Sequence, residues 1–100
     1  MSTEYVVLHN DKDNGLVADV VAISSWDGIE TIARFLIDHA GAKFVDQLDG
    51  PDARILKVRI EGDDLTLVHD DLMGNKLFVE GGGKDERVRS IAKAIQEAIS

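Results

Sequence analysis

The feature that most restricts the fold of this chain is a series of short apolar segments in its second half, separated by very short connections. The segments Ala53–Ile60, Asp64–His69 and Lys76–Glu80 are rich in large apolar residues, and Gly, Asp and Asn stand between them. Parallel strands need a crossover of a dozen or more residues, for which these connections are too short. We therefore expect an antiparallel meander, which begins with one further strand at Ala42–Leu48.

A second strand pair is expected near the N-terminus. The β-branched runs Tyr5–His9 and Gly15–Ile23 are joined through the sequence NDKDNG. Its Asn, Asp and Gly residues tolerate the positive φ that a hairpin loop needs. The pattern predicts an antiparallel hairpin.

Two stretches have the periodicity of amphipathic helices. Apolar residues recur at helical spacing first at Ile29, Ile32, Ala33, Leu36 and Ala40, and then at Val88, Ile91, Ala92, Ile95 and Ile99. Asp27 is expected to cap the first helix, with Glu30 as its capping-box partner and Gly41 as its stop.

The alternation within the central strand indicates how these elements pack. Leu56, Val58 and Ile60 alternate with Lys57 and Arg59, which is the period of a strand buried on one face only. We predict an α+β fold of two layers. A mainly antiparallel sheet of five to six strands carries two helices on one face, in the order ββαββββα.

Composition is consistent with a single folded domain that spans residues 1–100. The chain is 44% hydrophobic and 30% charged and has 1 Pro, so it lacks the signature of disorder. Cysteine is absent, which excludes disulfides, thiolate nucleophiles and Cys-ligated metal centres. No signal-peptide pattern and no apolar run approaching 18 residues is found. We expect a cytoplasmic protein that does not enter a membrane.

Charge restricts the partners of the chain. The net charge of −8 argues against binding nucleic acid or an anionic membrane through general electrostatic attraction. Residues 1–50 contain 9 acidic side chains against Lys12, Arg34 and Lys43. This acidic half either faces a partner with a basic surface or only keeps a small protein soluble.

The sequence LVHDDLMGNK contains the strongest candidate site. His69, Asp70 and Asp71 stand side by side before a Gly-Asn turn, and carboxylates with the carbonyl groups around Gly74 could offer a divalent cation several oxygens. The same residues are what a hairpin turn demands for local hydrogen bonds. Adjacent residues on a strand point to opposite faces, so His69 and Asp70 converge only if the turn brings them round.

Other motifs fail on their spacing. In NDKDNG, an EF-hand alignment places Lys12 and Val21 where oxygen ligands are required. In GGGKDER, a phosphate-binding P-loop would need glycine in place of Phe78 and a hydroxyl residue in place of Asp85. No HExxH or GxSxG pattern is found. The residues that usually carry enzymatic chemistry are therefore missing.

The only tryptophan, Trp26, stands in a turn before the first helix. A tryptophan in a loop is either an interface anchor or a lid over the edge of the core. Both roles are compatible with its position in the sequence.

We predict a small interaction protein of the inhibitor, immunity-protein or adaptor type, without enzymatic activity or cofactor. Electrostatic complementarity would guide it to a protein partner with a basic surface. The residues expected to contact that partner are Asp11, Asp13, Trp26, Asp70 and Asp71.

Two alternatives belong to other classes of function. One is a metal-dependent hydrolase or ligand-binding domain that uses His69, Asp70 and Asp71. The other is an obligate homodimer with a structural role, formed through the open sheet face or an edge strand. The element order is similar to that of immunity proteins of bacterial toxin systems and, without a leading helix, of roadblock-like adaptors. This similarity of architecture assigns no site residue.

Overall fold

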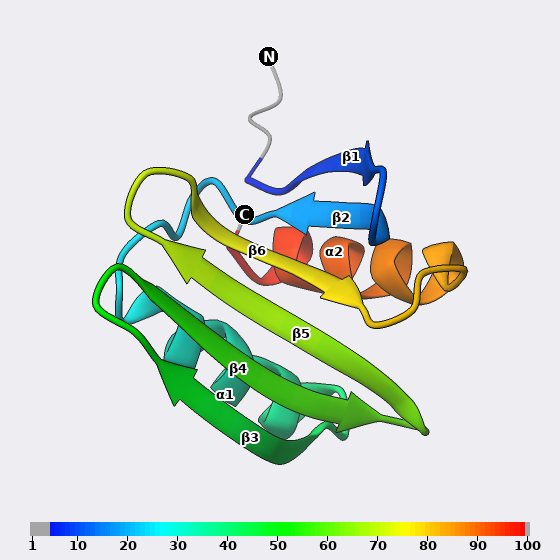
Figure 1. Ribbon diagram of the computed structural model, residues 1–100. Coiled ribbons are helices and arrows are strands. Elements are labelled where there is room, and N and C mark those ends of the chain that lie inside the picture. Colours follow the sequence, from blue (N-terminus) through cyan, green and yellow to red (C-terminus); the bar gives the residue numbers. More distant parts are fainter. Residues whose placement is uncertain (1–4, 100) are drawn as a thin grey trace.

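The computed structural model describes residues 5–99, which form the elements in the predicted order ββαββββα (Figure 1). The predicted α+β fold, with six antiparallel strands in one sheet and two helices, is confirmed. The elements are β1 (Val7–Asp11), β2 (Gly15–Asp19), α1 (Gly28–His39), β3 (Lys43–Asp49), β4 (Ala53–Ile60), β5 (Asp63–Asp70), β6 (Gly74–Val79) and α2 (Asp85–Ile99).

The sheet has the strand order β1-β2-β6-β5-β4-β3, and every neighbouring pair is antiparallel. Strands β3 to β6 pair in sequence order, as the short connections predict. The N-terminal hairpin joins this meander because β2 pairs with β6, with Ala18 opposite Leu77 and Asp19 opposite Lys76.

This order fixes which connections share an end of the sheet. Connections 20–27, 50–52 and 71–73 form one end, which we call the Trp26 end. Connections 12–14, 61–62 and 80–84 form the other, which we call the Gly82 end. The hairpin loop of β1 and β2 and that of β5 and β6 therefore lie at opposite ends (Figure 1).

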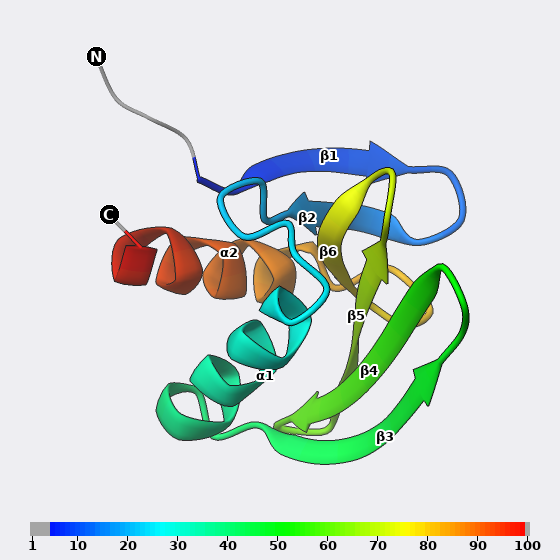
Figure 2. The same ribbon diagram turned by 90° about the vertical axis from the view of Figure 1, so that its left-hand side faces the viewer.

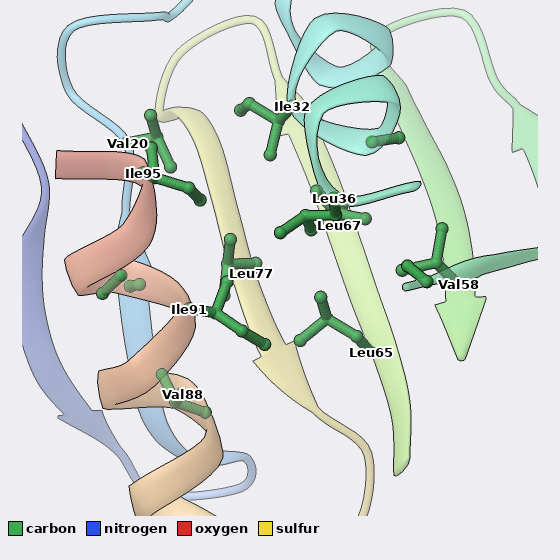
Figure 3. Close-up of a cluster of buried hydrophobic side chains, with 14 of the residues drawn as sticks. Val20, Ile32, Leu36, Val58, Leu65, Leu67, Leu77, Val88, Ile91 and Ile95 are labelled. Atoms are coloured by element: carbon green, nitrogen blue, oxygen red, sulfur yellow. The ribbon is translucent and has the colours of Figure 1, made fainter. Parts of the chain in front are cut away.

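Both helices lie on one face of the sheet (Figure 2). Helix α1 packs mainly on β4 and β5, whereas α2 packs on β1, β2 and β6. The core between the layers contains the predicted helical stripes together with the inward residues of the strands, among them Leu65, Leu67 and Leu77 (Figure 3). Within residues 5–99, neither helix is long and apolar enough to cross a membrane.

The N-terminal strands differ from the prediction in their limits. The first strand was expected at Tyr5–His9 but runs from Val7 to Asp11, and the second ends at Asp19 rather than Ile23. Beyond Asp19 the chain leaves the sheet and passes over its end toward α1. Val20 is nevertheless fully buried and Ile23 packs against the core, so this loop has the apolar composition of a strand.

The predicted capping box of α1 is wrong. The backbone of Asp27 is already helical, with φ −77° and ψ −13°, and its side chain makes no capping hydrogen bond. The first amide of the helix, that of Gly28, donates instead to the hydroxyl and the carbonyl oxygen of Ser25, at 3.1 and 3.0 Å. Glu30 does not reach back to the cap, because it pairs with Arg54 on β4.

Candidate functional site

Four polar side chains lie opposite one another on four neighbouring strands at the Trp26 end. In register, Asp49 of β3 faces Arg54 of β4, Arg54 faces His69 of β5, and His69 faces Asn75 of β6. Opposed residues share a face of the sheet, which here is the face that the helices cover. Arg54, His69 and Asn75 are only 4%, 3% and 3% exposed. We call this row the polar ladder.

Asn75 holds the loop before α1 against the ladder. Its side-chain amide nitrogen donates to the carbonyl oxygens of Ile23 and Ser25, at 2.8 and 3.1 Å. Its amide oxygen therefore faces Nδ1 of His69, at 2.6 Å. Because an amide oxygen only accepts hydrogen bonds, Nδ1 of His69 must carry the hydrogen. The backbone carbonyl of Asn75 also accepts the amide of Val20, at 2.9 Å.

Arg54 connects the ladder to α1 and to Trp26. Its Nε donates to the carboxylate of Asp49 at 3.0 Å, Nη1 to the carbonyl oxygen of Trp26 at 3.2 Å, and Nη2 to the carboxylate of Glu30. The hydrogen bond that Arg54 donates to Glu30 is the main cause that raises the pKa of Arg54, and the one that it donates to Asp49 lowers the pKa of Asp49. The buried guanidinium thus has two carboxylate partners, as burial of a charge requires.

Trp26 covers this group of side chains. Its ring lies 5.4 Å from the ring of His69 between centroids, with the two planes at 80°. The guanidinium carbon of Arg54 is 5.0 Å from the Trp26 ring centroid, which is a cation–π distance. Trp26 is half-buried and lies in contact with two buried side chains of the ladder, His69 and Arg54.

Of the three residues of the predicted metal site, the structure brings together His69 and Asp71 but not Asp70. His69 points into the ladder, and its Nε2 lies 3.1 Å from a carboxylate oxygen of Asp71. The carboxylate of Asp70 accepts the amides of Leu72 and Met73, at 2.8 and 3.1 Å, and these bonds lower its pKa. Among residues 5–99, no group of three or more His, Cys, Asp or Glu side chains is placed to hold a metal ion.

The two acidic loops named from the sequence are separated by the length of the sheet. Asp11 and Asp13 belong to the Gly82 end, where the Asp11 carboxylate accepts the backbone and side-chain amides of Asn14, at 3.1 and 2.7 Å. Asp70 and Asp71 belong to the Trp26 end. The structure therefore groups Trp26 with Asp70 and Asp71, and it places Asp11 and Asp13 elsewhere.

Sequence reasoning missed Arg54 and Asn75, although a signal for them exists. Strand side chains alternate between faces, so Arg54 belongs to the same face as the core residues Leu56 and Val58. Asn75 likewise precedes the core residue Leu77 by two positions. A polar residue at an inward position of a strand was the available indication of a buried polar cluster.

The surface around the ladder is acidic and has an apolar tip. Segments 19–30, 49–54 and 69–76 contain only two Lys or Arg side chains, the buried Arg54 and Lys76, and seven acids: Asp19, Asp27, Glu30, Asp49, Asp52, Asp70 and Asp71. Leu72, Met73 and Val21 are 94%, 73% and 53% exposed. A groove of about 300 Å³ lies between connections 20–27 and 71–73, so acidic and apolar side chains line one hollow.

Comparison with known proteins gave no match: no family model fits the chain, and neither a curated protein nor a solved structure is similar to it.

Proposed function

We propose that this chain is a non-enzymatic protein-interaction module that binds a partner with a basic surface through its Trp26 end. The observation that carries the proposal is the exposure of Leu72 and Met73, 94% and 73%, at the tip of a loop that acidic side chains surround. A cytoplasmic location is part of this proposal and is supported by the absence of cysteine.

The two kinds of side chain have separate roles in this proposal. Asp52 and Asp71 are exposed and lie on adjacent loops, since the amide of Asp71 donates to the carbonyl oxygen of Asp52 at 3.3 Å. Their charge accelerates encounter with a basic surface. Leu72 and Met73 supply the apolar anchors, which usually carry most of the affinity.

The polar ladder supports this surface. It connects the loop before α1 to β6 through Asn75 and to β4 through Arg54. Asp71, which precedes the tip, contacts the buried His69. A binding loop held in one conformation loses less entropy on association, so buried hydrogen bonds beneath the surface favour binding.

The test is an affinity capture from the protein's own cells, followed by titration of the captured protein at several salt concentrations. The D52K/D71K variant should weaken binding at least tenfold and flatten its salt dependence. The matched control is D11K/D13K, which changes the net charge equally at the Gly82 end and should leave binding within twofold. Equal loss in both variants would show that only overall charge matters, and equal binding by all three proteins would reject the proposal.

A further double variant examines the apolar anchors. L72S/M73S removes exposed apolar side chains whose replacement should leave thermal stability unchanged, and it should speed dissociation at least tenfold. The salt dependence should persist, because the acids remain. An unchanged dissociation rate would exclude the tip as the anchor.

The metal-dependent alternative has less support from the geometry. His69 is 3% exposed, and both of its ring nitrogens already face oxygens of the protein. A metal at His69 would require the polar ladder to open. Thermal melting with and without Mg²⁺, Mn²⁺, Ca²⁺ and Zn²⁺ tests this alternative, because an ion bound only by the native state raises Tm.

The homodimer alternative through the open sheet face also has less support. Charged side chains on that face already pair within the chain: Lys57 with Glu80 at 2.6 Å and Arg59 with Asp64 at 2.7 Å. Thr66 is only 4% exposed although no helix covers it. Long paired side chains thus cover much of the face by themselves. Light scattering at two concentrations tests for the dimer.

A further inference from the structure

The largest exposed apolar side chains outside the Trp26 end gather on one edge strand. Phe44, Val45 and Leu48 of β3 are 57%, 42% and 57% exposed. Within residues 5–99, strand β3 pairs with β4 alone, so its other edge has no partner strand, although the backbone amide of Gln47 donates to the side chain of Asp46 at 2.8 Å. Exposed apolar side chains and a free backbone edge thus coincide over seven residues.

The apolar side chains of β3 point to both faces of the sheet. Phe44 lies opposite Val58, a core residue, and so points to the helix-covered face. Leu48 lies opposite Ile55 and points to the open face, because the bulge at Val45 shifts the register between them. Phe44 is exposed although it points to this face, and α1 packs mainly on β4 and β5.

We propose that β3 is a docking edge, to which the partner adds an extended segment of alternating basic and apolar residues as a seventh strand. The inference rests on the proposed function and names the form of the partner's contact. In strand addition the backbone supplies hydrogen bonds and alternate side chains supply specificity. Side chains of an added strand alternate between faces. Its apolar residues would therefore pack beside Phe44 on the helix-covered face, and its basic residues would lie near Asp46 on the open face, where their aliphatic stems cover Leu48.

Charge complementarity indicates which occupant fits. Asp46 and the neighbouring Asp52 form no ion pair with a Lys or Arg among residues 5–99, whereas Asp49 is already held by Arg54. The end of β3 leads directly into the Trp26 end. A basic segment matches these charges. A second copy of this chain would bring the same aspartates and a net charge of −8 against them, which opposes self-pairing.

The opposite edge strand of the sheet, β1, is shorter, and its apolar side chains are less exposed. Strand β1 has five residues, and its exposed apolar side chains, Val7 and Leu8, are 38% and 37% exposed. The amides of Tyr5 and Val6, just before it, donate to the side chain of Gln96 on α2, both at 2.9 Å. His9 is paired with Asp19 at 3.0 Å. This edge serves as the matched control.

The probe is a synthetic peptide of alternating Lys and Val, seven residues long and blocked at both ends. On binding, amide hydrogen exchange within residues 43–49 should slow at least tenfold, whereas exchange in β1 should not change. The F44K/L48K variant should bind the peptide at least tenfold more weakly, and V7K/L8K should bind within twofold of the natural chain. Thermal melting of both variants confirms that they are folded.

Three outcomes would overturn the inference. A peptide with N-methylated backbone amides that binds equally well would exclude strand pairing. Exchange that slows only in residues 70–73 would place the peptide at the Trp26 end alone. A dimer that F44K/L48K dissociates would make a second copy the occupant.

The failure of this inference is distinguishable from failure of the proposed function. If capture of the basic partner is abolished by D52K/D71K but is insensitive to F44K/L48K, the interaction function stands and the β3 edge does not. If neither double variant affects capture, both are wrong.

Discussion

The two ends of the sheet manage their acidic residues in different ways. At the Gly82 end, Asp63 pairs with Arg87 at 3.0 Å and with Lys84 at 3.5 Å. Each of these cations is itself partly exposed. At the Trp26 end, the guanidinium is that of Arg54, which is buried and already holds Glu30 and Asp49. Among residues 5–99, no Lys or Arg forms an ion pair with Asp52 or Asp71.

This difference suggests a division between stability and binding. The Gly82 end holds Asp63 in ion pairs within the chain, and exposed ion pairs contribute about 0–1 kcal/mol each. The Trp26 end uses its buried cation, Arg54, internally and leaves Asp52 and Asp71 on the surface. At the Trp26 end, buried hydrogen bonds hold the loops in place, and these two surface acids have no Lys or Arg partner within the described part of the chain. Such an end is suited to bind a basic partner.

The largest expected effect is from Arg54. The R54M substitution removes the buried cation that pairs with Glu30 and Asp49, together with its hydrogen bond to the carbonyl oxygen of Trp26. We expect it to lower the free energy of unfolding by about 3 kcal/mol. The comparison variant R87M, at the partly exposed pair of the Gly82 end, should cost about 1 kcal/mol or less. Urea unfolding measures both, and equal costs would remove the proposed difference between the ends.

A smaller effect is expected from Asn75. The N75A substitution leaves Nδ1 of His69 and the carbonyl oxygens of Ile23 and Ser25 without their partner, at a cost of about 2 kcal/mol. The control is T66V on the open face, where one hydrogen bond to the exposed Glu80 is lost at 3.2 Å. That nearly isosteric change should cost about 0.5–1 kcal/mol. Thermal unfolding would contradict this reasoning if T66V were the more damaging change.

Alanine substitution of one turn glycine at each end compares the backbone constraints of the two ends. Gly74 and Gly62 have φ +80° and +86°, so an alanine is strained at both. A Cβ at Gly74 would in addition meet the Cβ of Ser24 at 3.4 Å, whereas nothing lies within 4 Å at Gly62. We expect both substitutions to cost about 1 kcal/mol, with G74A a few tenths larger. Chemical unfolding should rank them in that order.

The pH dependence of stability offers a further comparison of the two ends. Arg54 lowers the pKa of Asp49, and Arg87 lowers the pKa of Asp63. A carboxyl group whose pKa is lowered by folding stabilises the folded state at pH values above its unfolded pKa of about 3.9. This stabilisation is lost as the pH falls through the pKa of the folded state. The D49N and D63N variants should therefore be less stable than the natural chain at pH 7, and each deficit should shrink below about pH 4.

The D49N deficit should be the larger of the two, because it leaves a buried guanidinium with Glu30 as its carboxylate partner. Urea unfolding at a series of pH values measures both deficits. A D63N deficit that equals or exceeds that of D49N would show that burial of Arg54 has no special cost.

The periodicity of the sequence predicted much of the fold and little of the candidate site. Alternation in β4 and the helical stripe of α2 report which side chains face inward, and the structure confirms them. The cap at Asp27 failed because Glu30, a local partner by spacing, is attracted to Arg54 across 24 residues. Residue spacing along the sequence does not reveal a competing partner that comes near only when the chain folds.

By itself, the sequence determined the element order, the antiparallel meander and the inward face of β4, because these depend on neighbours a few residues apart. The tertiary structure decided which loops share an end. Pairing of β2 with β6 sends the loop with Asp11 and Asp13 to one end and leaves Asp70 and Asp71 at the other with Trp26. That pairing joins segments more than fifty residues apart, and it brings the loop before α1 within hydrogen-bonding distance of Asn75. Periodicity shows that a side chain is buried, but only the assembled sheet shows which residues surround it.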